Sequence, residues 1–328
     1  MTMVGPSIAE IQAQHNQLSG SVLRTPVIRC PALEARLAGG TEVFAKLEFL
    51  QRTGSFKVRG AIATMQTLSK DQLLRGVTAV SAGNHAIATA YAAQMIGTSA
   101  KVLMTPSANT YRIESCKSYG AEITIADDIH HAFRIAKMLQ EDEGRYLVHP
   151  FDGPLIALGT GTIGLEICDQ VDHFDSIIVP IGGGGLIGGL SNAVKQLKPE
   201  TEIIGVEPEG ADSMHRSFIK GAAEKLDGAM TTIADSLGAP FSTPYSYELT
   251  KENVDRLVMI EDLQIQEAMG SLFKLMNIAV EPACAASTAA LLGPLRKSLQ
   301  GKRVVLVMCG SNIDWDSFYR YAVFNDVD

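Results

Sequence analysis

The fold is decided by residues 177–189, IIVPIGGGGLIGG, where an apolar strand runs through four consecutive glycines into a helix. Four residues without side chains let the backbone fold closely around an anion and direct several N–H groups at it. The helix that follows adds its partial positive charge. A phosphate is therefore the expected ligand, and a tightly packed turn is the alternative. The spacing matches neither the dinucleotide-binding fingerprint nor the nucleotide-binding loop that ends in lysine.

Short apolar runs alternate with longer segments along the rest of the chain. The longer segments carry apolar residues at helical spacing, as in residues 86–96, 129–141, 186–197 and 263–277. This alternation predicts an α/β fold with open, mostly parallel sheets and helices on both faces. The expected strands are Val43–Leu47, Val77–Ser81, Lys101–Met104, Ile123–Ala126, Tyr146–Val148, Ser176–Ile181, Glu202–Glu207, Arg256–Ile260 and Val304–Cys309.

Composition narrows the class of protein. The chain has 328 residues, which suggests two domains or one large one. Its net charge of -8 argues against a nucleic-acid partner, which would need clustered lysine and arginine. No apolar stretch reaches the roughly 18 residues that span a bilayer, so no membrane partner is expected. The five cysteines are scattered and the first residues lack a signal-peptide pattern, which favours a cytoplasmic location.

A lysine lies in the second informative segment, residues 53–61, TGSFKVRGA. A lone lysine near a helix start is usually a solvated charge. Here a glycine and serine turn precedes Lys57 and small residues follow it. A desolvated lysine with a lowered pKa can form a Schiff base with a carbonyl compound. The segment therefore marks Lys57 as a candidate catalytic residue.

The third segment, residues 81–85, SAGNH, follows an expected strand and opens a helix. Ligands bind at such strand ends in open α/β sheets. Asn84 offers a donor and an acceptor to a ring substituent, and the backbone N–H groups of the turn could receive a carboxylate. The alternative is a helix-capping turn in which His85 is packed and hydrogen-bonded. The expected substrate-binding residues are Ser81, Ala82, Gly83, Asn84 and His85.

Together the three segments resemble fold-type II pyridoxal-phosphate enzymes, specifically the serine/threonine dehydratase and serine racemase group. The resemblance covers nearly the whole chain, from Arg24-Thr25-Pro26 to Cys309-Gly310-Ser311-Asn312. It implies a tryptophan synthase β-like architecture with two domains, each an open, twisted, mostly parallel sheet. Residues 1–68 and 150–328 are expected to form the large cofactor-binding domain, and residues 69–149 the small substrate-side domain. A homodimer or larger homo-oligomer is also expected.

The resemblance also assigns roles around pyridoxal 5'-phosphate. Lys57 would carry the cofactor and remove the substrate's α-proton, Phe56 would pack against the cofactor, and Asn84 would bond the ring hydroxyl. Glu281 would lie near the ring, and Cys309 matches the position that faces the pyridine nitrogen. A neutral residue there makes the ring a weaker electron sink, which suits elimination. The phosphate would be held by Gly182, Gly183, Gly184 and Gly185.

The activity that these roles imply is removal of water and then ammonia from a small β-hydroxy amino acid. L-threonine and L-serine are the expected substrates, and 3-hydroxyaspartate or a bulkier β-hydroxy amino acid is an alternative. Serine racemases of this group use a serine as a second base, at the position of Ala82 here. Alanine has no proton to give, which favours a dehydratase over a racemase. A binding protein without catalysis is the third hypothesis, and the retained Lys57 and glycine loop argue against it.

Three departures from the family pattern leave questions open. Glu207 and the carbonyl of Ala211 match a divalent-cation site, but Ser213 stands where relatives have aspartate. Because Mg²⁺ and Ca²⁺ need several oxygen ligands, both a bound cation and a surface Glu207 stay open. The pair His130-His131 also departs from the pattern. So do Leu158 and Thr160, in the later segment 158–162. The last two departures leave the identity of the substrate open.

Overall fold

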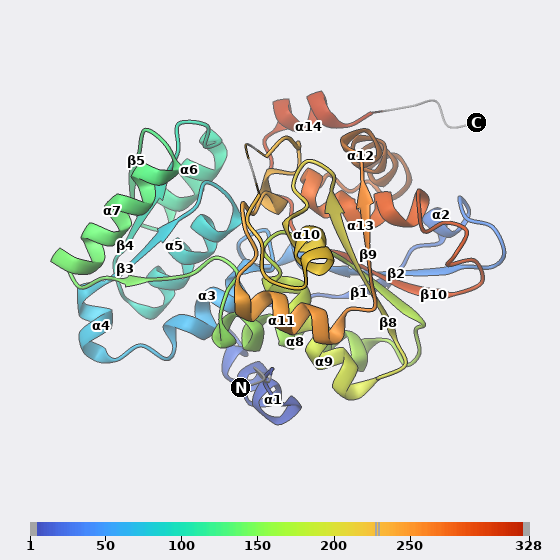
Figure 1. Cartoon of the computed structure of the whole chain (residues 1–328), viewed down its shortest axis with the longest axis horizontal. Helices are drawn as coiled ribbons and strands as arrows, with labels where there is room; N and C mark the ends of the chain where they lie inside the picture. The colour runs from blue at the N-terminus through green and yellow to red at the C-terminus, as the bar shows by residue number, and fades with distance from the viewer. Residues whose placement is uncertain (1–4, 227, 229, 324–328) are drawn as a thin grey trace.

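The computed structural model describes residues 5–226, 228 and 230–323 and contains two separate β-sheets (Figure 1). The strands are β1 (Val27–Arg29), β2 (Glu42–Leu47), β3 (Val77–Val80), β4 (Ala100–Met104), β5 (Glu122–Ile125), β6 (Tyr146–Leu147), β7 (Ser176–Pro180), β8 (Glu202–Pro208), β9 (Arg256–Ile260) and β10 (Arg303–Met308). The α-helices are α1 (Ile8–Leu18), α2 (Pro31–Glu34), α3 (Lys57–Met65), α4 (Lys70–Arg75), α5 (Asn84–Ile96), α6 (Thr110–Ser118), α7 (Ile129–Asp142), α8 (Pro154–Gln170), α9 (Gly185–Leu197), α10 (Ser213–Lys220), α11 (Pro244–Asn253), α12 (Asp262–Met276), α13 (Pro282–Leu292) and α14 (Trp315–Tyr321). Two short 3-10 helices are η1 (Glu48–Leu50) and η2 (Asp235–Leu237).

The larger sheet has six strands in the order β1-β2-β10-β7-β8-β9. Every neighbouring pair is parallel except β1 with β2. β10 lies at the centre, and its residues 304–308 are all buried, as expected for a strand covered on both faces. Helix α13 packs against this sheet, and α12 packs against α13. Helices α8 and α9 pack closely against each other, and α9 contacts β7. In Figure 1 these pairs lie on opposite sides of the strands.

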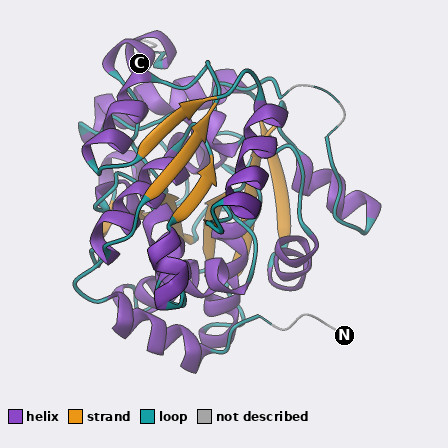
Figure 2. Ribbon diagram, turned by 90° about the vertical axis from the view of Figure 1, so that its left-hand side faces the viewer, coloured by secondary structure: helices purple, strands orange, loops and turns teal. Residues whose placement is uncertain are grey.

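The smaller sheet has four parallel strands in the order β5-β4-β3-β6. Successive side chains of a strand point to opposite faces. Accordingly, Val102 and Met104 join the apolar core beneath α5, whereas Leu103 joins the core beneath α7. Figure 2 faces this sheet and shows helices before and behind its strands. The α/β class with mostly parallel sheets, predicted from the alternation of segments, is confirmed.

All nine expected strands are present, with ends within one residue or two of those expected. β1 was not predicted, because it has three residues and pairs only at the edge of the sheet. The four-stranded sheet lies inside residues 69–149, and the division into two domains stays a prediction. Residues 1–4, 227, 229 and 324–328 of the expected large domain lie outside the described residues.

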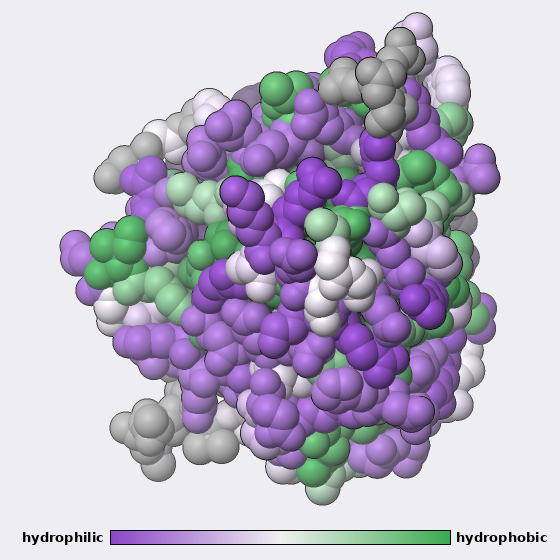
Figure 3. Space-filling model, turned by 90° about the vertical axis from the view of Figure 1, so that its right-hand side faces the viewer, coloured by the Kyte–Doolittle hydropathy of each residue, from purple (hydrophilic) through white to green (hydrophobic). Residues whose placement is uncertain are grey.

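The surface shows no broad apolar region on the side drawn in Figure 3, where hydrophilic residues dominate and hydrophobic ones form small separate spots. Within the described residues, no helix is long and apolar enough to cross a membrane.

Candidate active site

The predicted segments meet at the carboxyl ends of the parallel strands. β3 runs into Ser81, β7 into the glycine loop, and β10 into Cys309. Since β10 pairs with β7 in register, the residues that follow the two strands are neighbours. This edge is where open α/β sheets bind ligands.

Lys57 is the first residue of α3, and its surroundings hold it at this edge. Its Nζ donates a hydrogen bond of 2.6 Å to the carbonyl of Pro150. The preceding residue is fixed by the bond from the Phe56 N–H to the carbonyl of Cys309, at 3.1 Å. Burial lowers the pKa of Lys57 to about 8, although Cys309 and Glu281 act in the opposite direction. The amine is therefore partly neutral near neutral pH, as a nucleophile or base must be.

One residue of the glycine loop, Gly184, has a backbone conformation that larger residues rarely adopt. Gly184 has φ +88° and stands before the 13-residue helix α9. A Cβ on Gly183 would come within 2.3 Å of the Phe151 ring, and one on Gly185 within 2.4 Å of the Phe151 carbonyl. The loop is thus closely packed on one side, and the N–H groups at the start of α9 are available for an anion.

Asn84, Glu281 and Asn312 form a buried chain of hydrogen bonds between the two sheets. Asn84 Nδ2 donates to Glu281 Oε1 at 2.6 Å, and Asn312 Nδ2 donates to Asn84 Oδ1 at 2.6 Å. Glu281 is 0% exposed, and its other oxygen, Oε2, has no hydrogen-bond partner. Burial raises the pKa of Glu281 to about 7, whereas Arg112 lowers it. Asn84 and Glu281 thus lie together, and their roles at the cofactor ring stay predictions.

The other expected site residues lie nearby. His85 Nε2 bonds the carbonyl of Val148 at 2.8 Å, so this histidine is packed and hydrogen-bonded in the helix. Ser81 Oγ accepts the Gly83 N–H at 3.1 Å and shapes the turn before α5. A hydrogen bond with Cys284 and burial hold the pKa of the Cys309 thiol well above its usual range. Cys309 is therefore a neutral thiol.

Several residues of this region were not predicted. Arg112 and Asp235 form an ion pair beside Glu281. Ser236 Oγ lies 3.4 Å from Asn84 Nδ2. Two aromatic rings, His149 and Phe151, flank the proline that Lys57 contacts, with ring centroids 4.8 Å apart. None of these residues lies in a Gly-rich or spaced motif, so no local signal marks them.

At the expected metal site, backbone N–H groups occupy the carboxylate oxygens of Glu207. Glu207 is buried and accepts the N–H groups of Met214 and His215, at 2.9 and 2.7 Å, at the start of α10. Asp212 pairs with Arg216. Within the described part of the chain, no group of three or more histidine, cysteine or acidic residues could hold a metal ion. A cation at Glu207 and Ala211 stays a prediction.

The remaining departures lie outside this cluster of contacts. His130 and His131 begin α7, where the Asp128 side chain caps the helix by accepting the His131 N–H at 2.7 Å. Thr160 is buried between α8 and α9, and its hydroxyl donates to the carbonyl of Gly185 at 2.8 Å. Thr160 therefore supports the glycine loop.

The residues fit pyridoxal phosphate. A buried amine of lowered pKa, a helix start opened by glycines, and a buried carboxylate with an unpartnered oxygen would hold its aldehyde, phosphate and ring ends respectively. A family model described as "Pyridoxal-phosphate dependent enzyme" matches residues 18–310.

Known proteins of similar sequence and structure support the same family. The chain is 48% identical over 316 residues to a phenylserine dehydratase of Ralstonia pickettii, covering 96% of each chain. It is 37% identical over 309 residues to an L-threonine ammonia-lyase of Thermotoga maritima, covering 94% of this chain and 76% of that protein. Maize serine racemase superposes with a TM-score of 0.91 and 32% identity, over 97% of both chains. The chain belongs to the pyridoxal-phosphate dependent enzyme family that contains these proteins.

Proposed function

We propose that this protein is a dehydratase that converts a β-hydroxy amino acid to a 2-keto acid and ammonia. The observation that carries the proposal is Lys57, a desolvated amine held at the strand ends 2.6 Å from the Pro150 carbonyl. Relatives named as dehydratases and ammonia-lyases, identical at 36–48% of positions, support the reaction type. We also propose the cofactor-binding and substrate-binding residues expected from the sequence.

The residues divide the work as follows. Pyridoxal phosphate, when bound, supplies an electron sink that makes the α-proton of an amino acid removable. The Lys57 amine takes that proton, since its pKa of about 8 leaves part of it neutral near neutral pH. The neutral Cys309 thiol places no negative charge beside the ring, so the ring would be a weaker electron sink. A weaker sink favours loss of the β-hydroxyl, because the leaving group takes up the electrons. Asn84 and Glu281 orient the ring end of the cofactor site.

A racemase is the second candidate, and the similarity to maize serine racemase is its support. Racemisation needs acid/base groups on both faces of the α-carbon, whereas elimination needs a base on one. Ala82 has a methyl group where serine racemases carry the second base. We therefore favour elimination, and the yield of D-serine relative to pyruvate from L-serine tests the choice.

The group on the β-carbon of the substrate distinguishes the candidate substrates. L-threonine and L-serine remain candidates because several relatives bear the name of threonine dehydratase or ammonia-lyase. An aryl substituent is favoured by the 48% identical phenylserine dehydratase and by an aromatic group around Pro150, whose carbonyl Lys57 contacts. In that group the Phe151 ring lies 4.8 Å from His149 and 5.8 Å from Phe241, centroid to centroid. We propose that a phenyl ring on the β-carbon packs against these residues.

A keto-acid release assay on the cofactor-loaded enzyme tests both levels of the proposal. The panel is L-threonine, L-serine, 3-phenylserine and 3-hydroxyaspartate. Release from any of them supports the dehydratase, and release from none refutes it. Phe241→Ala should raise KM for 3-phenylserine more than for L-threonine, because only the larger substrate contacts the ring. Phe273→Ala, on the distant helix α12, is the matched control, and an equal change in both variants would refute the aryl site.

We further propose a homodimer in the cytoplasm. Leu23 and Leu50 are exposed apolar residues, and they lie on neighbouring segments because the side chain of Gln51, the residue after Leu50, bonds the backbone of Leu23. Exposed apolar side chains that lie together are typical of protein contacts. Sedimentation of the purified protein tests the dimer, and Leu50→Glu should favour the monomer.

A further inference from the structure

Glu281 is a buried carboxylate at the boundary between the two sheets. It precedes α13 of the larger sheet, and its Oε1 accepts the amide of Asn84 from α5 of the smaller sheet. Its Oε2 has no hydrogen bond and lies 3.6 Å from Arg112 Nη2. The other charged or titratable groups that face Glu281 are Asp235, Lys57 and Cys309.

Arg112 reaches Glu281 from across the boundary between the sheets. It belongs to α6, which covers the smaller sheet, yet it is only 5% exposed. Its Nε donates to the Asn312 carbonyl at 3.0 Å, and Nη1 and Nη2 donate to the two oxygens of Asp235 at 2.5 and 3.2 Å. Asn312 follows β10, and Asp235 begins η2. The guanidinium thus bonds two segments of the larger half and leaves one edge directed at Glu281.

Arg112 is the main group that favours the ionised form of Glu281, against the larger effect of burial. Burial favours the neutral form of Glu281, and Asp235 favours it too. Asp235 is 61% exposed on its side chain, so solvent screens its charge. The neutral Cys309 thiol adds no charge. Arg112 is the nearest cation to Oε2, and an opposite charge within about 4–6 Å favours the ionised form.

We propose that Arg112 is a positioning residue that favours the ionised form of Glu281 while α6 is docked, so that Glu281 fixes the amide of Asn84 toward the cofactor ring. The proposal rests on the proposed function only in that it concerns the same site. An ionised Oε1 is an acceptor alone and can only receive Nδ2 of Asn84, which leaves Asn84 Oδ1 for Asn312. A protonated Glu281 is also a donor, and it would allow the amide to turn over. Arg112 lies on α6, beside the smaller sheet, and Glu281 lies beside the larger sheet. The orientation of Asn84 therefore depends on the packing that brings Arg112 next to Glu281.

The test is a pH titration of the visible absorption spectrum of the cofactor-loaded enzyme. A transition is expected near pH 7 in the wild type, from Glu281, and Glu281→Gln should abolish it. Arg112→Gln removes the cation and should move the midpoint upward by about one unit or more. Arg112→Lys keeps a charge without the planar fork and should move it upward by less. Arg134→Gln, the same change at an exposed position of α7, should leave it unchanged.

A midpoint in Arg112→Gln equal to that of Arg134→Gln would overturn the proposal. If Arg112→Gln does not fold, Arg112→Lys carries the test, and an unshifted midpoint overturns the proposal in the same way. In the Glu281→Gln background, Arg112→Gln should change neither the spectrum nor the affinity for pyridoxal phosphate further, because Arg112 acts through Glu281. These readouts need bound cofactor and no turnover. An enzyme that shows the shift but releases no keto acid would therefore refute the proposed function alone.

Discussion

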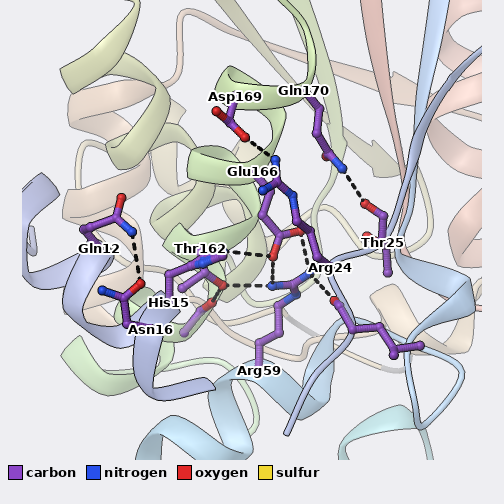
Figure 4. A network of polar contacts seen from close by, with 12 residues as sticks. Gln12, His15, Asn16, Arg24, Thr25, Arg59, Thr162, Glu166, Asp169 and Gln170 are labelled. Atoms are coloured by element: carbon purple, nitrogen blue, oxygen red, sulfur yellow. Dashed lines mark hydrogen bonds and ion pairs between the residues drawn. The ribbon is translucent and has the colours of Figure 1, made fainter. Parts of the chain in front are cut away.

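Replacing Arg59 by methionine should greatly lower the free energy of unfolding, because Arg59 is the centre of a buried ionic network (Figure 4). The side chain is 0% exposed, and it lies on α3, two residues after Lys57. Its Nε and Nη2 donate to Glu48 at 2.9 and 2.8 Å, while Nη1 and Nη2 donate to Glu166 at 2.7 and 2.9 Å. All its donors are used, and two carboxylates depend on it.

The size of the stability loss follows from the partners that Glu48 and Glu166 retain without Arg59. Glu166 retains Lys46 Nζ at 2.5 Å, so its charge stays paired. Among the described residues, Glu48 retains the hydroxyl of Thr25 as a hydrogen-bond donor and the more weakly acting charge of Lys46, and it is fully buried. Removing one partner of a buried ion pair costs about 3–5 kcal/mol, a large share of the roughly 5–15 kcal/mol that stabilises a typical domain. We expect Arg59→Met to fall in this range of about 3–5 kcal/mol.

Urea unfolding followed by circular dichroism measures the loss. The matched control is Arg24→Met, which removes the partner of Asp169 on the same helix α8, a pair that Figure 4 also shows. That pair is 50% and 65% exposed, so its loss should cost about 0–1 kcal/mol. Glu48→Gln added to Arg59→Met should restore part of the stability by removing the unpaired charge. An Arg59→Met protein as stable as the control would refute the reasoning.

Four further predictions concern the site. Lys57→Ala should abolish the visible band of the bound cofactor and keto-acid release, and turnover at the wild-type rate would rule out its role. The cofactor-free protein should take up pyridoxal phosphate faster as pH rises through about 8, because the pKa of Lys57 is lowered to that value and only the neutral amine attacks an aldehyde; a flat stopped-flow profile would contradict this. Ala82→Ser should raise D-serine relative to pyruvate from L-serine by supplying the missing acid, as chiral chromatography can measure; an unchanged ratio would count against that role. If Glu207 and Ala211 hold a cation, EDTA should lower the melting temperature and Mg²⁺ should restore it, and no response to either would exclude the site.

Much of the fold could be predicted from local patterns. Strands such as residues 304–308 are buried on both faces and therefore appear as continuous apolar runs. The glycine loop is equally local, since four consecutive residues without side chains are informative without any knowledge of their neighbours. β1 escaped prediction because a three-residue edge strand has almost no pattern of its own. Its existence depends on the pairing of Val27–Arg29 with residues 44–46 of β2.

By itself, the sequence determined the α/β class, the expected strands, the glycine loop and Lys57, because each depends on residues close together in the chain. Only the tertiary structure decided which side chains meet. The bond between Asn84 and Glu281 joins residues 197 apart, and those between Arg59 and Glu166 join residues 107 apart. Arg112 lies on a helix with no unusual pattern, and it becomes part of the site only because α6 packs beside Glu281 and the start of η2. The physical reason is that burial and charge pairing act through space, whereas periodicity and backbone freedom act along the chain.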